Sequence, residues 1–486
     1  MSTRVQGVAR LWRHVRPIEA LLVGALALYA ASLTLFPRVW RRWPLRSHYY
    51  YQNKDLFDAL ISNGVPLLLT LGALVLLTWR RRRISPGVLV ALFACAVSLQ
   101  WSLSFLEGLN ARRLSSTLVA PQYGHSEFLL RAEREEHPLD LARTYEQRCA
   151  AEEGRSYAKS KPPGHLLFYV LTARLYSALP IQGAFEWLAE HGGFASRGTA
   201  TALGAFTTLV FSLVSGLPVI VLSVLGARLE KSARAGVTYG LVFLLSPAIA
   251  LVTMHLDQVL YPLLVSLVLL AAVLALERHA ALGALAGVAV YGSLYVSFSL
   301  LFLVPTVGLW WGAHFAFRSE QRRRVVMAGT CFLLGALAAY ALLRFGLSFE
   351  IGLAYRRAME QHAAWRGPTG LIGVAGTTRN LVEAAVWLGL PAAILAVRHY
   401  LRSSARVWRG PDPVAVFCVC YPLIVIAVSV FGHATREIGR LWIPMLIPAQ
   451  LVVAREVNRL YPRRPTIYLL LAAATLLLAK NYHDIR

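Results

Sequence analysis

Long apolar stretches alternate with short polar gaps along most of the chain, and this pattern predicts a bundle of membrane helices. A helix of about 20 residues crosses the hydrocarbon core of a bilayer. Thirteen stretches reach or approach that length, at 18–36, 63–79, 87–106, 200–226, 235–253, 258–276, 281–297, 299–317, 325–345, 380–397, 413–431, 440–455 and 466–480. We therefore expect an all-α, polytopic integral membrane protein with about 13 transmembrane helices.

Residues 107–199 interrupt this pattern because they are too polar to cross a membrane. The pattern divides the chain into a three-span segment (1–106), a large extracytoplasmic loop with juxtamembrane helices (107–199), and a bundle of about ten spans (200–486). Two further outer loops are expected at 346–380 and 432–440. The amino terminus would lie inside and the carboxyl terminus outside.

The charges support this orientation. Hydrophobic residues make up 57% of the 486 residues, which excludes an ordinary soluble enzyme. The net charge of +24 comes largely from compact clusters such as Arg80–Arg83 and Arg322–Arg324 in the gaps, which is the positive-inside pattern and not a nucleic-acid-binding surface. Segment 37–62 is an exception, since it places basic residues on the outer side. The composition, rich in Arg and Ala, suggests a bacterial plasma (inner) membrane.

The large loop ends in a distinctive turn within Tyr157–Tyr169. Lys161 precedes Pro162 and Pro163, which stiffen the backbone and disfavour helix for the residue before them. Gly164 then allows close approach of another segment. The apolar run Leu166–Leu179 would invert the later charge pattern if it crossed, so we expect a helix lying in the interface.

Polar groups that could carry chemistry gather on the expected outer side. His255 and Asp257 interrupt two apolar runs, where ionisable residues are usually functional. A second group is the stretch His433–Arg440, and a third lies in the large loop. Carboxylates can take a proton from a hydroxyl nucleophile, and arginine or lysine can hold a phosphate. This combination suits a reaction with an anionic lipid substrate.

Four short motifs resemble those of the GT-C superfamily of membrane glycosyltransferases, in particular the group of protein O-mannosyltransferases and the aminoarabinose transferase of lipid A. The motifs are Tyr123-Gly-His-Ser-Glu127, Lys161-Pro-Pro-Gly, His255-Leu-Asp257 and Arg436-Glu-Ile-Gly-Arg440. The Pro-Pro turn is the most specific of them. The resemblance extends over most of the chain in topology, but in sequence it is limited to these patches.

The resemblance implies transfer of a sugar from a polyprenyl-phosphate donor to a lipid, glycan or protein acceptor on the extracytoplasmic side. Glu127 and Asp257 would then be catalytic, with Glu127 as the general base of an inverting displacement. Substrate-binding roles would fall to Lys161, His165, Tyr123, His125, His255, His433, Arg436, Glu437 and Arg440. The superfamily allows a divalent metal, although no ligand set in the sequence demands one.

Departures from the family pattern leave alternatives open. The family's carboxylate is typically an Asp in the first outer loop, whereas Glu127 lies in the second outer segment, so Asp55 and Asp58 are rivals for the role of base. A polytopic transporter or flippase, and a surface-polysaccharide ligase or polymerase, are alternative functions. Charges at the ends of the apolar runs, and not at their centres, favour the transferase over the transporter.

Overall fold

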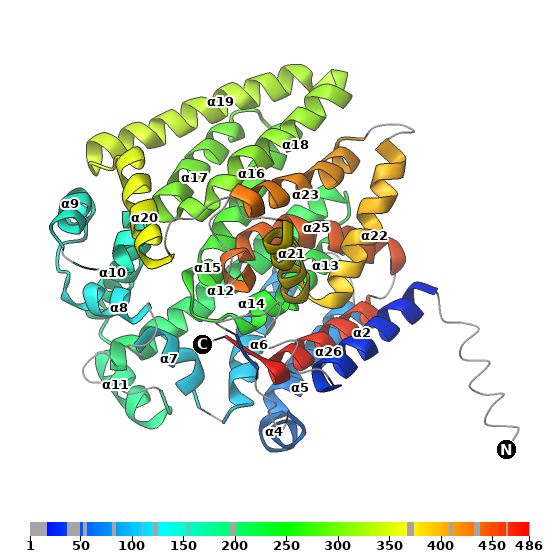
Figure 1. Cartoon of the computed structure of the whole chain (residues 1–486), viewed down its shortest axis with the longest axis horizontal. Coiled ribbons are helices and arrows are strands. Elements are labelled where there is room, and N and C mark those ends of the chain that lie inside the picture. The colour runs from blue at the N-terminus through cyan, green and yellow to red at the C-terminus, as the bar shows by residue number, and fades with distance from the viewer. Residues whose placement is uncertain are drawn as a thin grey trace, which may run out of the picture.

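A computed structural model describes residues 17–35, 49–51, 56–79, 84–108, 110–119, 125–152, 154, 156–194, 201–366, 374–407, 412–431, 438–462 and 465–485. These residues form an all-helical protein apart from one short pair of strands (Figure 1). The all-α prediction is therefore confirmed for the described chain.

The first part of the chain is mostly helical and apolar. It comprises α2 (Pro17–Leu35), β1 (Tyr49–Tyr51), α4 (Leu56–Asn63), α5 (Val65–Trp79) and α6 (Pro86–Phe105). Strand β1 pairs antiparallel with β2 (His483–Ile485), with Tyr50 opposite Asp484. This pairing joins the segment after the first apolar helix to the end of the chain, as expected if both lie on the same side of the membrane.

The expected large loop is itself helical. It contains α7 (Arg112–Val119), α8 (His125–Arg134), α9 (Pro138–Ala151), the 3-10 turn η1 (Ala158–Ser160), α10 (Pro163–Ala178) and α11 (Gln182–His191). Helices α8, α9 and α10 lie together with α20 at one end of the bundle, at the left of Figure 1. Helix α2 lies on the opposite side of the view, at the lower right of Figure 1.

The remaining helices form the main bundle. They are α12 (Thr201–Leu229), α13 (Ala233–Leu244), α14 (Pro247–Leu251), α15 (Leu256–Val259), α16 (Tyr261–Glu277), α17 (Leu282–Val296), η3 (Phe298–Phe302), α18 (Leu303–Phe317), η4 (Ser319–Gln321), α19 (Arg322–Ala341), η5 (Leu342–Gly346), α20 (Ile351–Arg366), α21 (Val374–Leu388), α22 (Leu390–Val407), α23 (Pro413–Phe431), α24 (Ile438–Leu441), α25 (Ile443–Leu460) and α26 (Thr466–Tyr482).

Seven helices in the described ranges are long and apolar enough to cross a membrane, or up to eight if a bent pair counts as one span. Four more apolar helices are shorter, among them Val65–Trp79 and Leu282–Val296. The long helices indicate a multi-pass membrane protein. The expected number of thirteen spans is not shown, although each of the thirteen expected stretches contains helix.

Two expected spans are divided into separate helices. Stretch 380–397 is broken between α21 and α22, whose axes differ by 114°. Gly389 stands at the break with φ of +97°, a conformation that other residues rarely adopt. Stretch 235–253 likewise divides into α13 and α14, because the chain turns at Ser246 before Pro247 starts a new helix.

Small residues allow the closest helix packing in the bundle. A side-chain carbon on Gly283 or Gly287 of α17 would collide with the backbone of α19, and one on Gly335 of α19 would collide with α17. Backbones that approach this closely are typical of membrane helices, where association depends on van der Waals packing and not on the hydrophobic effect.

Candidate functional site

The Lys-Pro-Pro turn has the conformation that its sequence dictates. Lys161 is extended, with φ −124° and ψ 152°, as the residue before a proline should be. Pro163 occupies the first position of α10, where its missing N–H costs no hydrogen bond. A side-chain carbon on Gly164 would lie 2.6 Å from the carbonyl oxygen of Tyr295 at the end of α17. The expected close approach at Gly164 is therefore confirmed.

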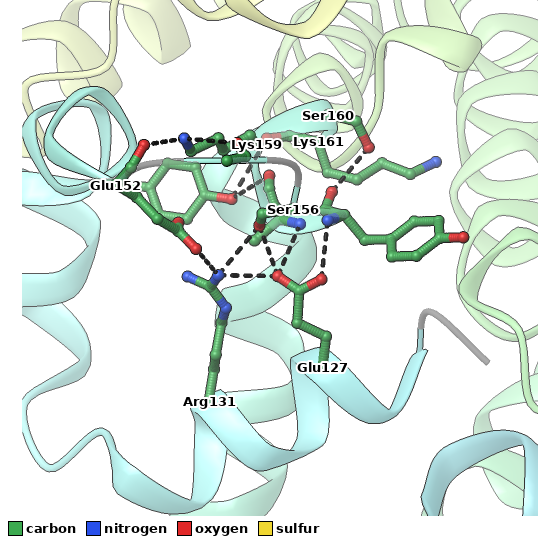
Figure 2. A network of polar contacts seen from close by, with 11 residues as sticks. Glu127, Arg131, Glu152, Ser156, Lys159, Ser160 and Lys161 are labelled. Carbon is green, nitrogen blue, oxygen red and sulfur yellow. Dashed lines mark hydrogen bonds and ion pairs between the residues drawn. The ribbon is translucent and has the colours of Figure 1, made fainter. Parts of the chain in front are cut away.

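Glu127 holds this turn from the first turn of α8 (Figure 2). Its Oε1 accepts a hydrogen bond from Ser156 Oγ at 2.6 Å, and its Oε2 accepts one from the Tyr157 backbone N–H at 2.8 Å. Arg131, one helical turn along α8, places Nη2 2.8 Å from Oε1 and also pairs with Glu152. Both carboxylate oxygens are thus engaged in fixing the segment before Lys161.

Two more side chains clamp the turn from other elements. The Tyr145 hydroxyl of α9 donates to the Ala158 carbonyl at 2.7 Å. Arg357 of α20 donates to the carbonyls of Lys159 and Lys161, at 3.1 and 3.0 Å. Its guanidinium lies over the Tyr145 ring, 5.1 Å from the centroid, and forms an ion pair with Glu146. The outer segment 346–380 therefore contributes to the same turn as the large loop.

Behind the turn lies a buried chain of histidines. His125 Nδ1 is 2.9 Å from the Tyr169 hydroxyl, and His125 Nε2 is 2.7 Å from His255 Nδ1. Arg440 Nη1 is also 3.2 Å from His255 Nδ1. Because a guanidinium can only donate, His255 Nδ1 is an acceptor. His125 Nε2 must then carry a proton, and His125 Nδ1 accepts from Tyr169.

These tautomers require that the imidazoles of His125 and His255 are neutral. Burial and the nearby cations favour the neutral form of both. Burial lowers the pKa of His125 well below its usual value, and the charges of Arg440 and Lys161 lower it further. Burial and the charge of Lys161 lower the pKa of His165 in the same sense. His165 Nδ1 lies 2.9 Å from the Tyr261 hydroxyl, while its Nε2 is buried and has no hydrogen-bond partner among the described residues.

Asp257 completes the cluster from the first turn of α15. Its side chain is 3% exposed, and Oδ2 lies 3.9 Å from Arg440 Nε. Its other oxygen, Oδ1, is buried without a hydrogen-bond partner in the described part of the chain, as are both amide atoms of the neighbouring Gln258. Burial raises the pKa of Tyr169 well above its usual value, and the negative charge of Asp257 adds to this effect. Buried polar atoms without partners are rare and commonly mark a functional site.

The structure thus unites most of the predicted residues that it describes. His125, His165, His255, Asp257 and Arg440 form one cluster, which we call the histidine cluster; Lys161 lies within electrostatic reach of its three imidazoles. Glu127 supports the adjoining turn. Tyr123, His433, Arg436, Glu437 and Asp55 lie outside the described residues. Asp58 is described and is exposed on α4.

Several residues of the site were missed by the sequence analysis. Arg131 and Tyr169 could have been found, because each lies four residues after a predicted site residue and so on the same helix face. Arg357 carried no such signal, since it reaches the turn from a helix about 200 residues away along the chain. Within the described ranges, no group of three His, Cys, Asp or Glu side chains could hold a metal ion.

Comparisons with known protein families, with curated proteins and with solved structures give no match for this chain. Its function must therefore be argued from the geometry of the site.

Proposed function

We propose that this protein is a membrane glycosyltransferase that transfers a sugar from a polyprenyl-phosphate donor to a hydroxyl acceptor on the extracytoplasmic side. One observation carries the proposal. Asp257, whose Oδ1 is buried without a hydrogen-bond partner among the described residues, stands beside Arg440 and two residues after His255, which feels the charge of Lys161 in the Lys-Pro-Pro turn. A carboxylate beside cationic groups provides both a base and a binding site for a lipid phosphate.

The convergence of distant segments supports the same conclusion. The cluster draws on α8, α10, α15 and α24, which are far apart in the sequence, and the turn is clamped from α9 and α20. Maintaining several buried polar groups in apolar surroundings costs free energy unless each is satisfied. His165, Asp257 and Gln258 each keep a buried polar atom without a partner among the described residues. A bound polar substrate that pairs with these atoms explains the arrangement better than a contribution to stability does.

The reaction that we propose is a direct displacement. Asp257 takes the proton of the acceptor hydroxyl as its oxygen attacks the anomeric carbon. The bond from that carbon to the phosphate oxygen breaks, and the configuration at the carbon inverts. Arg440 and Lys161 stabilise the negative charge on the departing lipid phosphate, as preorganised cations do in other transferases.

Glu127 takes a positioning role in this proposal, because its oxygens already accept hydrogen bonds from Ser156 and Tyr157 and pair with Arg131. The prediction that Glu127 is the base stays open to test. A general base contributes about 10²- to 10⁴-fold to the rate. We expect Asp257→Asn to lose activity on that scale, whereas Glu127→Gln should lose roughly tenfold, since the amide still accepts one of its hydrogen bonds.

The test is transfer of radiolabelled sugar from a panel of polyprenyl-phosphate sugars to membranes that contain the protein. Glu136→Gln is the matched control, because Glu136 is an exposed carboxylate of the same loop. Loss in Asp257→Asn and Arg440→Gln, with activity retained in Glu136→Gln and normal thermal unfolding, would support the proposal. Full activity in Asp257→Asn with loss in Glu127→Gln would return the base to Glu127, and no transfer from any donor would contradict the proposed function.

A transporter is a second candidate because of the broken helix pair α21 and α22. Glu383 and Asn380 are buried in α21 near this break, and ionisable groups within discontinuous helices often form substrate sites in transporters. Substrate uptake into vesicles that is lost in Glu383→Gln, without any transferase activity, would favour this alternative.

A further inference from the structure

An apolar groove is lined by residues of α2 and α22, which lie at the right of Figure 1, together with Leu460 of α25. Its volume is about 1100 Å³, above the roughly 300–1,000 Å³ of typical small-molecule sites. Its lining is Pro17, Ile18, Leu21, Ala393, Ile394, Val397, Arg398, Leu401, Arg402 and Leu460. The walls are thus aliphatic, and two arginines are the charged groups among these lining residues.

Arg402 distinguishes this groove from an ordinary crevice between helices. Its Nη1 is buried and has no hydrogen-bond partner among the described residues. A buried guanidinium nitrogen without an acceptor is costly, since charged groups in apolar surroundings need a partner. An acceptor supplied by a ligand would remove that cost.

The nearby carboxylate does not fill this need. Glu456, which is fully buried, accepts hydrogen bonds from Arg398, His399 and Arg459, so its oxygens are already occupied. Arg402 experiences the positive charges of Arg459, Arg406 and Arg398 as well as that one negative charge. Among these groups cations outnumber anions, and the end of the groove therefore favours an anionic ligand.

We propose that this groove binds an anionic phospholipid of the cytoplasmic leaflet, with its acyl chains along α2 and α22 and its phosphate against Arg402. The aliphatic walls match hydrocarbon chains, and the excess positive charge matches a phosphate. The groove lies among the helix ends that carry basic clusters, which face the cytoplasm by the positive-inside rule, where anionic lipids provide a negative surface. This inference does not depend on the proposed glycosyl transfer.

A different occupant would be residues 1–16 of this chain, which directly precede α2. That segment contains four arginines and no Asp or Glu. Its charge would add to the positive charge at Arg402, whereas a phosphate would neutralise it. Charge complementarity therefore favours the lipid over the chain's own amino terminus.

The test is lipid binding to the purified full-length protein in nonionic detergent, measured by native mass spectrometry. Phosphatidylglycerol and phosphatidylcholine with identical acyl chains are the probes. We expect phosphatidylglycerol to bind at least tenfold more tightly, and Arg402→Gln to remove most of this preference. Arg323→Gln is the matched control, because Arg323 is an exposed arginine at the start of α19 and does not line the groove.

A second variant tests the apolar part of the site. Val397→Trp should fill the groove and weaken the binding of both lipids, while leaving Arg402 in place. Equal binding of the two lipids, or an equal effect of the Arg402 and Arg323 substitutions, would overturn the proposal in favour of a diffuse basic surface. Binding that occurs only after residues 1–16 are deleted would identify that segment as the occupant and would also overturn it.

Discussion

The clamp that Arg357 places on the Lys-Pro-Pro turn gives the most direct prediction. Arg357→Ala removes two hydrogen bonds to backbone carbonyls, at 3.1 and 3.0 Å, and leaves Glu146 without its ion-pair partner. The two side chains are 13% and 14% exposed, so solvent can compensate little. Breaking a buried pair by removing one partner costs about 3–5 kcal/mol. Allowing for the residual exposure, we expect a loss of about 3 kcal/mol.

The pH dependence of this loss has a definite sign. Burial raises the pKa of the Glu146 carboxyl above its ordinary value, and Arg357 partly counteracts this. Without Arg357 the pKa should rise further. A carboxyl whose folded-state pKa is raised binds more protons in the folded state, so its effect on stability becomes more unfavourable as pH rises through that pKa. Arg357→Ala should therefore be more destabilising at pH 8 than at pH 5.

The assay is thermal unfolding of the purified protein in detergent at both pH values, with limited proteolysis to detect opening of the turn. The matched control is Arg356→Ala, because Arg356 is an exposed arginine next to the clamp. A double-mutant cycle with Glu146→Gln isolates the contribution of the unpaired carboxylate, which should amount to about 1–3 kcal/mol. Equal stability of the Arg357 and Arg356 variants, or a loss that is independent of pH and of Glu146, would refute the reasoning.

Two further predictions concern packing and charge. Gly164→Ala should lower the melting temperature and any turnover, because the new carbon would collide with the Tyr295 carbonyl. The control is Gly183→Ala in α11, where the new carbon meets nothing within 4 Å, so this variant should be neutral or stabilising. Equal melting temperatures of the two variants would contradict this prediction. Burial raises the pKa of Glu456, but hydrogen bonds from its cationic neighbours outweigh this and bring it to about 2. The stability that Glu456 contributes is therefore present above the ordinary pKa of Glu and is lost only as pH falls toward 2. Glu456→Gln should lower the melting temperature by the same amount at pH 6 and pH 8. If the destabilisation by Glu456→Gln disappeared at either pH, the role of Glu456 as an ionised partner of its neighbours would be contradicted.

The candidate site could be predicted from the sequence only in part. His255 and Asp257 were singled out because ionisable residues between apolar runs are unusual, whereas His125, His165 and Arg440 were predicted from the resemblance to a known family. Their mutual contacts were not predictable, since His125 and His255 meet across 130 positions of the chain. Glu127 was predicted as the general base, and its hydrogen bonds with Ser156 and Tyr157 depend on how the loop folds back on α8. Residues 432–437, which carry three of the predicted site residues, are not described.

The sequence by itself determined the local backbone structure. Apolar runs must become helices in a membrane, because every backbone polar group has to be satisfied within its own segment. The proline ring fixes φ and excludes helix for the residue before it, which is why Lys161 is extended. Tertiary structure decided the rest. The 114° bend at Gly389, the approach of Arg357 to the turn and the groove beside Arg402 depend on which helices pack together. Helix periodicity and hydropathy do not encode those partners, because the same apolar surface can pack against many others.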